Sequence, residues 1–222
     1  MNPNLSSTGV LSADSFVRLF KQERASAILR TNHQEAACNA MNAAMRGGFR
    51  ILEFTLSVPG ALELIAEFSK KPGVVVGAGT VLTVEEVDRV VAAGAQFVVS
   101  PVMDVAVIQR AKELGVASMP GTSTPTEMLQ AHRAGAPLQK LFPEVGTGPM
   151  WVKQTLGPLP FLNIVPTSGV TLANAAAYLE AGSAAVGFVN SLFVPEDIKA
   201  GAFDRIEARA RAMLEAVNAP RP

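Results

Sequence analysis

Cysteine and histidine, two residue types that often build metal and redox sites, are scarce in this chain. Its 222 residues include one cysteine, Cys38, and two histidines, His33 and His132. A lone cysteine forms no internal disulfide, and Cys38 stands in a helical pattern with no second cysteine or clustered histidine to share a metal. The two histidines fall far apart, in predicted helices. We therefore expect no metal site, and the cysteine content fits a reducing cytoplasm.

The sequence also lacks excess charge and long apolar runs. Lysine plus arginine equals aspartate plus glutamate at 19 each, so no net field attracts nucleic acid or an anionic membrane. No stretch stays apolar for the roughly 20 residues of a membrane-spanning helix, and residues 1–14 do not resemble a secretory signal. We expect neither nucleic acid nor membrane as a partner. Small molecules are the expected partners.

A repeating strand and helix pattern fills most of the chain. Hydrophobic residues make up 49% of it, enough for a large core in one domain of this length. Short apolar runs recur, each followed by a turn and a longer segment with helical spacing. We predict eight strands, at residues 25–29, 50–56, 74–78, 97–100, 117–119, 139–142, 163–165 and 184–188.

Local signals support the helices between these strands. Thr83, Thr124 and Thr171 stand at predicted helix starts, where a hydroxyl caps free backbone amides. Glycines suited to a left-handed helix end occur just before five strands, at Gly47, Gly94, Gly115, Gly135 and Gly182.

Alternating strands and helices imply a parallel sheet, and eight such units favour an α/β fold, a single (β/α)8 barrel. Residues 13–22 are predicted to form a helix closing the bottom of the barrel. We divide the chain into an N-terminal extension, residues 1–12, and a catalytic barrel, residues 13–222. An open doubly wound sheet is the alternative, weakened by the lack of GxGxxG after the first strand.

A glutamate lies inside one predicted strand. Side chains in residues 50–56 alternate between two faces, and Ile51, Glu53 and Thr55 share one of them. We predict that Glu53 points into the barrel, where lost hydration raises a carboxyl pKa toward the range useful for proton transfer. Glu53 is therefore a candidate general acid and base. The plainer alternative is a glutamate bonded to a barrel arginine or to backbone amides.

Lys140 differs from the other lysines, which fall on predicted helices or their ends. It lies inside the apolar stretch Leu138 to Phe142, which directly precedes Pro143. Desolvation lowers the pKa of a lysine by up to about 3 to 5 units in extreme cases, which makes the amine nucleophilic near neutral pH. We predict a Schiff-base lysine here. The plainer alternative is a lysine that only pairs with Glu53.

Small polar residues follow other strands, where barrel active sites form. Ser168, Gly169 and Ser191 follow the seventh and eighth strands, which commonly cradle phosphate, although such turns also arise for conformational reasons alone. Arg30, after the first strand, is a candidate for binding a substrate carboxylate. Its alternative is a salt bridge to Glu53.

Four segments, residues 51–56, 77–82, 97–101 and 140–143, together resemble the 2-keto-3-deoxy-6-phosphogluconate/4-hydroxy-2-oxoglutarate aldolase family in order and spacing. The resemblance covers about residues 25–195. It implies a homotrimer of (β/α)8 barrels acting as a class I aldolase, a lyase that needs no cofactor. By this resemblance Lys140 is the Schiff-base lysine and Glu53 the general acid and base. The implied pocket residues around the keto acid are Arg30, Thr80, Pro101, Phe142 and Thr167.

The chain departs from the family at the phosphate end of the site. Many members have an arginine where this chain has Ser57, and a Gly-Gly turn where it has Ser168 and Gly169. Their Gly-Gly-Ser after the eighth strand corresponds here to residues 189–191. Bulkier side chains there obstruct a close approach of backbone amides to phosphate.

These residues predict cleavage of a 2-keto-3-deoxy sugar acid to pyruvate and an aldehyde. The substrate would be of the 6-phosphogluconate or the 4-hydroxy-2-oxoglutarate type. One alternative is a sugar-phosphate isomerase or epimerase, with Glu53 as base and Lys140 as an electrostatic group. Another is a catalytically idle barrel that binds a metabolite or serves in an assembly.

Overall fold

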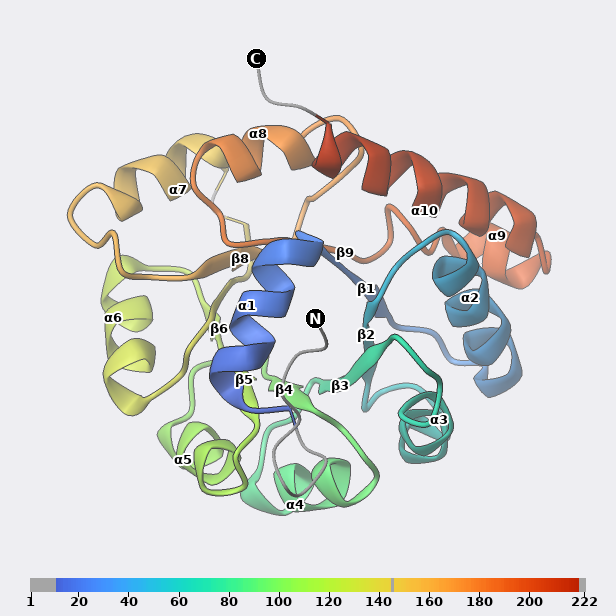
Figure 1. The fold of residues 1–222 in the computed structure, drawn as a ribbon, viewed down its shortest axis with the longest axis horizontal. Coiled ribbons are helices and arrows are strands. Elements are labelled where there is room, and N and C mark those ends of the chain that lie inside the picture. The colour runs from blue at the N-terminus through green and yellow to red at the C-terminus, as the bar shows by residue number, and fades with distance from the viewer. Residues whose placement is uncertain (1–10, 145, 220–222) are drawn as a thin grey trace.

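Strands and helices alternate along the computed structural model, which describes residues 11–144 and 146–219. The strands are β1 (Ala25–Leu29), β2 (Ile51–Thr55), β3 (Val75–Gly79), β4 (Phe97–Val99), β5 (Ala117–Met119), β6 (Gly121–Thr122), β7 (Gln139–Leu141), β8 (Ile164–Pro166) and β9 (Val186–Phe188). The helices are α1 (Ala13–Glu23), α2 (Gln34–Arg46), α3 (Ala61–Phe68), α4 (Val84–Ala92), α5 (Val105–Glu113), α6 (Pro125–Ala134), α7 (Pro149–Leu156), α8 (Ala175–Glu180), α9 (Pro195–Lys199) and α10 (Phe203–Asn218). In Figure 1 the helices α2 to α10 surround the strands as an outer ring.

The strands form one closed, all-parallel barrel. Six pair in the order β5-β4-β3-β2-β1-β9 and three in the order β6-β7-β8. β5 and β6 are the two halves of one strand interrupted at Pro120, whose carbonyl accepts a hydrogen bond from the Lys140 amide (3.0 Å). The ring closes where the Ala184 amide donates to the Ile164 carbonyl (2.9 Å). This arrangement confirms the predicted (β/α)8 barrel, so the open-sheet alternative is wrong.

The predicted elements agree with the structure apart from local differences at helix ends. Each predicted strand is present, with ends within two residues of those predicted. Thr83 and Thr124 cap α4 and α6 in complete capping boxes. Thr171 does not cap α8, which begins at Ala175 because the Asn174 side chain binds the Thr171 amide (2.8 Å). Gly47 is right-handed, and its neighbour Gly48 is left-handed instead.

Helix α1 closes the end of the barrel opposite the carboxyl ends of the strands. Figure 1 shows α1 lying across the strands at this end. Phe16 and Phe20 are fully buried there, and the Phe16 ring stacks on Phe97 with 4.5 Å between centroids. Leu11 packs into the same cluster, while residues 1–10 of the predicted extension lie outside the described residues. The predicted closing helix is confirmed, and the cavity of the barrel lies toward its carboxyl end.

The helices of the described residues do not include one that is both long and apolar enough to cross a bilayer. Their apolar faces instead cover the outside of the strands, as where the Phe54 ring of β2 packs edge-on against Phe68 of α3 (5.0 Å between centroids).

Replacing Phe16 with alanine is expected to lower the free energy of unfolding by about 3–5 kcal/mol, because a fully buried ring is lost and a cavity remains. Phe161→Ala is the control, since that ring is 48% exposed, and its effect should stay below about 1 kcal/mol. Urea denaturation followed by circular dichroism measures both. Equal losses for the two variants would show that α1 lies outside the cooperative core.

Candidate active site

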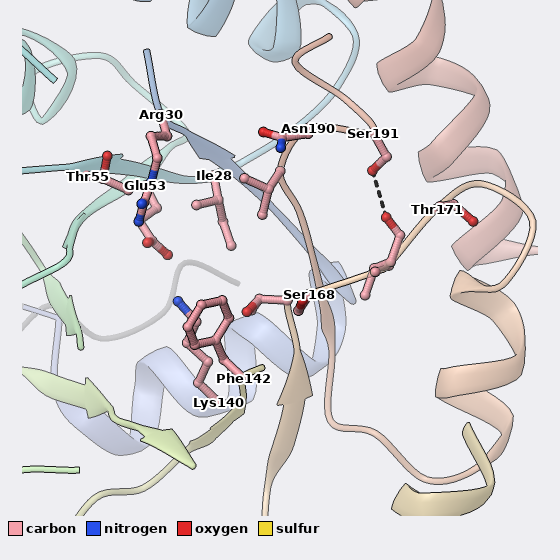
Figure 2. A pocket seen from close by; sticks show the side chains of 14 residues that line it. Ile28, Arg30, Glu53, Thr55, Lys140, Phe142, Ser168, Thr171, Asn190 and Ser191 are labelled. Carbon is pink, nitrogen blue, oxygen red and sulfur yellow. Dashed lines mark hydrogen bonds between the residues drawn. The ribbon is translucent and has the colours of Figure 1, made fainter. Parts of the chain in front are cut away.

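A cavity of about 360 Å³ opens at the carboxyl ends of the strands. This volume lies at the lower end of the range of small-molecule sites, roughly 300–1,000 Å³. Figure 2 shows side chains from β1, β2 and β7 and from the loops after β8 and β9 converging on it. The cavity therefore lies where barrel enzymes carry their active sites.

Glu53 enters the cavity from β2. Alternation along the strand places Ile51 in the closed end of the barrel and Leu52 against the outer helices, which turns Glu53 inward. The side chain is 1% exposed, and its Oε2 has no hydrogen-bond partner among the described residues. Burial raises the pKa of this carboxyl, and the charges of Lys140 and Arg30 oppose the rise. Glu53 is thus biased toward its protonated form.

The neighbouring strand β3 leaves room for this carboxyl. A Cβ placed on Gly79 would overlap Glu53 Oε1. A Cβ on Gly77 would lie 2.5 Å from the Phe97 ring, in the layer below. The absence of side chains at these two positions is therefore what allows Glu53 and Phe97 to fill the barrel interior.

Lys140 enters the cavity from β7. Leu141 belongs to the core under the outer helices, and the Gln139 side chain donates to the Ala136 carbonyl (2.9 Å). Lys140 therefore takes the opposite, inward face, where it is 8% exposed with Nζ 4.9 Å from the Phe142 ring centroid. Burial lowers the pKa of its amine; the positive charge of Arg30 also lowers it, whereas the charge of Glu53 raises it.

Lys140 and Arg30 point toward Glu53 from two sides in Figure 2. Neither ion pair of the plainer alternatives is present among the described residues: Lys140 forms no salt bridge, and Arg30 does not bridge to Glu53. Arg30 instead lies exposed at the rim, where it donates to Thr80 Oγ1 (3.1 Å). The ion pairs that are present lie on the outer helices, as between Arg110 and Asp88. The acid and the amine therefore face a shared space with their reactive atoms free.

Most of the predicted site residues line this cavity, and two do not. The residues on its wall are Arg30, Glu53, Lys140, Phe142, Thr167, Ser168, Gly169 and Ser191. Thr80 is not on this wall, but its hydroxyl accepts a hydrogen bond from the Arg30 guanidinium. Pro101 is not on it either, and its carbonyl packs where a Cβ on Gly121 would lie. Both were predicted as pocket residues.

The wall also includes residues that were not among the predicted site residues: Ile28, Thr55, Val170, Thr171, Val189 and Asn190, of which Asn190 had been noted only as a strand-exit residue. Alternation could have identified two of them, because Ile28 shares a strand face with Arg30, and Thr55 shares one with Glu53. The other four belong to the loops after β8 and β9, whose course depends on contacts between the loops. One such contact is the hydrogen bond from Ser191 Oγ to the Val170 carbonyl (2.7 Å), drawn in Figure 2.

Thr167 is the second polar side chain of the cavity without a partner. It is 4% exposed, and its Oγ1 makes no hydrogen bond with the described residues. An unpartnered buried hydroxyl is costly unless a ligand or water completes it. Together with Glu53 Oε2, this atom offers the cavity two polar groups that a bound molecule can satisfy.

Comparison with known proteins places the chain among aldolases. The family model for KDPG and KHG aldolase, the enzymes of 2-keto-3-deoxy-6-phosphogluconate and 4-hydroxy-2-oxoglutarate, matches residues 17–209. A probable 2-dehydro-3-deoxy-6-phosphogalactonate aldolase of Rhizobium meliloti (strain 1021) is 37% identical, over 87% of this chain and 91% of that protein. The KHG/KDPG aldolase of Escherichia coli (strain K12) is 35% identical, over 82% and 86% respectively.

Solved structures agree with this assignment. The KDPG aldolase of Legionella pneumophila, with pyruvate captured as a covalent carbinolamine intermediate, superposes with a TM-score of 0.80. It is 27% identical, and the match covers 89% of this chain and 97% of that one. Because the family model spans most of the barrel and relatives above 30% identity cover most of both sequences, this chain belongs to the KDPG and KHG aldolase family.

Proposed function

We propose that this cavity cleaves a 2-keto-3-deoxy sugar acid to pyruvate and an aldehyde through a Schiff base on Lys140. One observation carries the proposal: a buried amine that has no ion-pair partner in the described part of the chain faces a buried carboxyl across a small cavity. The environments shift the pKa of Lys140 downward and that of Glu53 upward, toward a neutral nucleophile and a proton donor. Relatives named as lyases of this type support it.

The chemistry follows from these two groups. Neutral Lys140 adds to the keto carbon, and Glu53 donates the proton with which the carbinolamine hydroxyl leaves as water, giving an iminium ion. The iminium accepts the electron pair of the breaking carbon–carbon bond, while Glu53 or a water it holds removes the proton of the distal hydroxyl. The aldehyde departs and an enamine stays on Lys140. Protonation of the enamine carbon and hydrolysis then release pyruvate.

The remaining wall residues orient the keto acid. Arg30, at the rim, and the unpartnered Thr167 hydroxyl are proposed to hold its carboxylate, with Thr80 fixing the guanidinium. Phe142 covers the Lys140 amine, while Ser168, Gly169 and Ser191 contact the distal part of the substrate. Orientation of this kind supplies several kcal/mol of barrier lowering.

We further propose that the protein works in the cytoplasm as a homotrimer, without a cofactor and with residues 13–222 as its catalytic domain. The single cysteine supports a cytoplasmic location. The family resemblance supports the homotrimer. Every wall residue of the cavity lies between Ile28 and Ser191, within these bounds, which supports the domain assignment.

Incubation with pyruvate and borohydride is expected to label Lys140 covalently, because reduction traps the iminium. Peptide mass spectrometry locates the adduct. Lys140→Met should abolish both labelling and cleavage, while Lys112→Met, on the exposed face of α5, should retain both. An unlabelled Lys140 in an active protein would instead favour the isomerase-like alternative, in which this amine acts only electrostatically.

Glu53→Gln is expected to lower kcat about 10²- to 10⁴-fold, the usual contribution of a general acid and base. It should also move the pH midpoint of pyruvate trapping downward. The charge of Glu53 raises the pKa of Lys140, so its removal leaves the amine neutral at lower pH. Arg30→Met should move the midpoint upward, because the Arg30 charge lowers that pKa.

Trapping measured across pH by quantitative mass spectrometry tests both shifts. Glu63→Gln, which removes a carboxylate from the exposed side of α3, is the control and should leave the midpoint in place. Shifts of the same sign in the Glu53 and Arg30 variants would contradict the proposed electrostatic coupling.

A further inference from the structure

The cavity is asymmetric in charge. Lys140 and Arg30 are the cationic residues of its described wall, and both lie at the end assigned to the keto acid. The other end, formed by the loops after β8 and β9, presents the neutral polar side chains of Ser168, Asn190 and Ser191. The described wall therefore has no cation at this end to balance a negative charge on a ligand.

A carboxylate stands beside this neutral end. Glu144 follows β7 on an exposed loop, and its Oε2 lies 2.9 Å from the position a Cβ on Gly169 would take. Gly169 itself lines the cavity. The pKa of Tyr178 is raised by its burial and then by the charge of Glu144, so this charge acts on groups around the loop. An anion seated on Gly169 would meet the same field.

Three hydrogen-bond donors of the two loops are already in use. The Thr171 amide donates to Asn174 Oδ1 (2.8 Å), and Asn174 Nδ2 donates to the Gly169 carbonyl (2.9 Å). The Ser191 hydroxyl donates to the Val170 carbonyl (2.7 Å). The first two bonds lie within the loop after β8, and the third joins the two loops. Together they occupy three donors that could otherwise hold an anion. The helix that follows, α8, has only six residues and contributes little dipole.

We propose that the site selects substrates whose far end is an uncharged polyol, and that it discriminates against a terminal phosphate or a second carboxylate. The inference rests on the proposed function and narrows its substrate class. A phosphate carries about −1.5 to −2 charges at neutral pH and would lie near Glu144 without a balancing cation. The Ser168 hydroxyl and the Asn190 amide can instead form hydrogen bonds with an uncharged ligand.

Condensation in the synthetic direction tests this directly. Pyruvate is combined with glyceraldehyde, with glyceraldehyde 3-phosphate or with glyoxylate, which present a neutral, a phosphorylated and a carboxylate end. We expect kcat/KM for glyceraldehyde to exceed that for each anionic aldehyde by about tenfold or more. A phosphorylated aldehyde that reacts as well as glyceraldehyde, or better, overturns the proposal.

A variant tests whether Glu144 causes the discrimination against anionic aldehydes. Glu144→Gln should raise kcat/KM for the anionic aldehydes roughly fivefold, the modest size expected of an exposed charge, and leave glyceraldehyde unchanged. Glu180→Gln, at the exposed end of α8, is the matched control and should change none of the three. An unchanged ratio in Glu144→Gln overturns the role of this carboxylate.

Pyruvate trapping on Lys140 is measured alongside, because it needs no aldehyde. Loss of trapping would refute the proposed function itself. Normal trapping together with a preference for the phosphorylated aldehyde would leave the lyase intact and refute only the substrate class.

Discussion

The function proposed for this barrel depends on an amine kept away from water without an anionic partner in contact. Lys140 is 8% exposed, and it forms no salt bridge among the described residues. An ammonium in that position loses the stabilisation that water gives it, and no contact ion pair among the described residues offsets this loss. The amine therefore binds its proton less tightly. The Glu53 charge opposes this effect, and Arg30 reinforces it. The useful state of the site is therefore a balance among three groups, in which a direct Lys140–Glu53 contact would hold the amine in its unreactive form.

The barrel maintains this balance from below and from the side. Helix α1 closes the amino-terminal end with Phe16 and Phe20, so the interior is packed up to the layer on which Glu53 rests. Gly79 makes space for the carboxyl in the neighbouring strand. The cavity opens at the mouth, where Arg30 and the loops after β8 and β9 lie. Packing far from the cavity thus contributes to the pKa of both reactive groups, because it determines how deeply they are desolvated.

Strand alternation made much of the fold and the reactive pair predictable from sequence. It fixed the inward direction of Glu53, and an apolar strand around Lys140 showed that this lysine is unlike those on helices. Two local features were not predictable. The strand is interrupted at Pro120, which has no backbone N–H to donate to a neighbouring strand. Helix α8 begins late, since the Asn174 side chain accepts a hydrogen bond from the Thr171 amide. The resemblance suggested Pro101 as a pocket residue, but the cavity wall does not include it, and its carbonyl packs closely against Gly121. Contacts between loops, such as that of Ser191 with Val170, leave no periodic signal in sequence.

Titration of Lys140 itself tests the central claim most directly. Lysine labelled with ¹³C at Cε, with Lys140 assigned by its loss in Lys140→Met, reports the protonation of each amine by NMR across pH. The account predicts that Lys140 titrates below the ordinary lysine value of about 10.4, while the lysines on the outer helices serve as internal references. A Lys140 that titrates with those references, or above them, would contradict the claim that burial has freed its amine for attack.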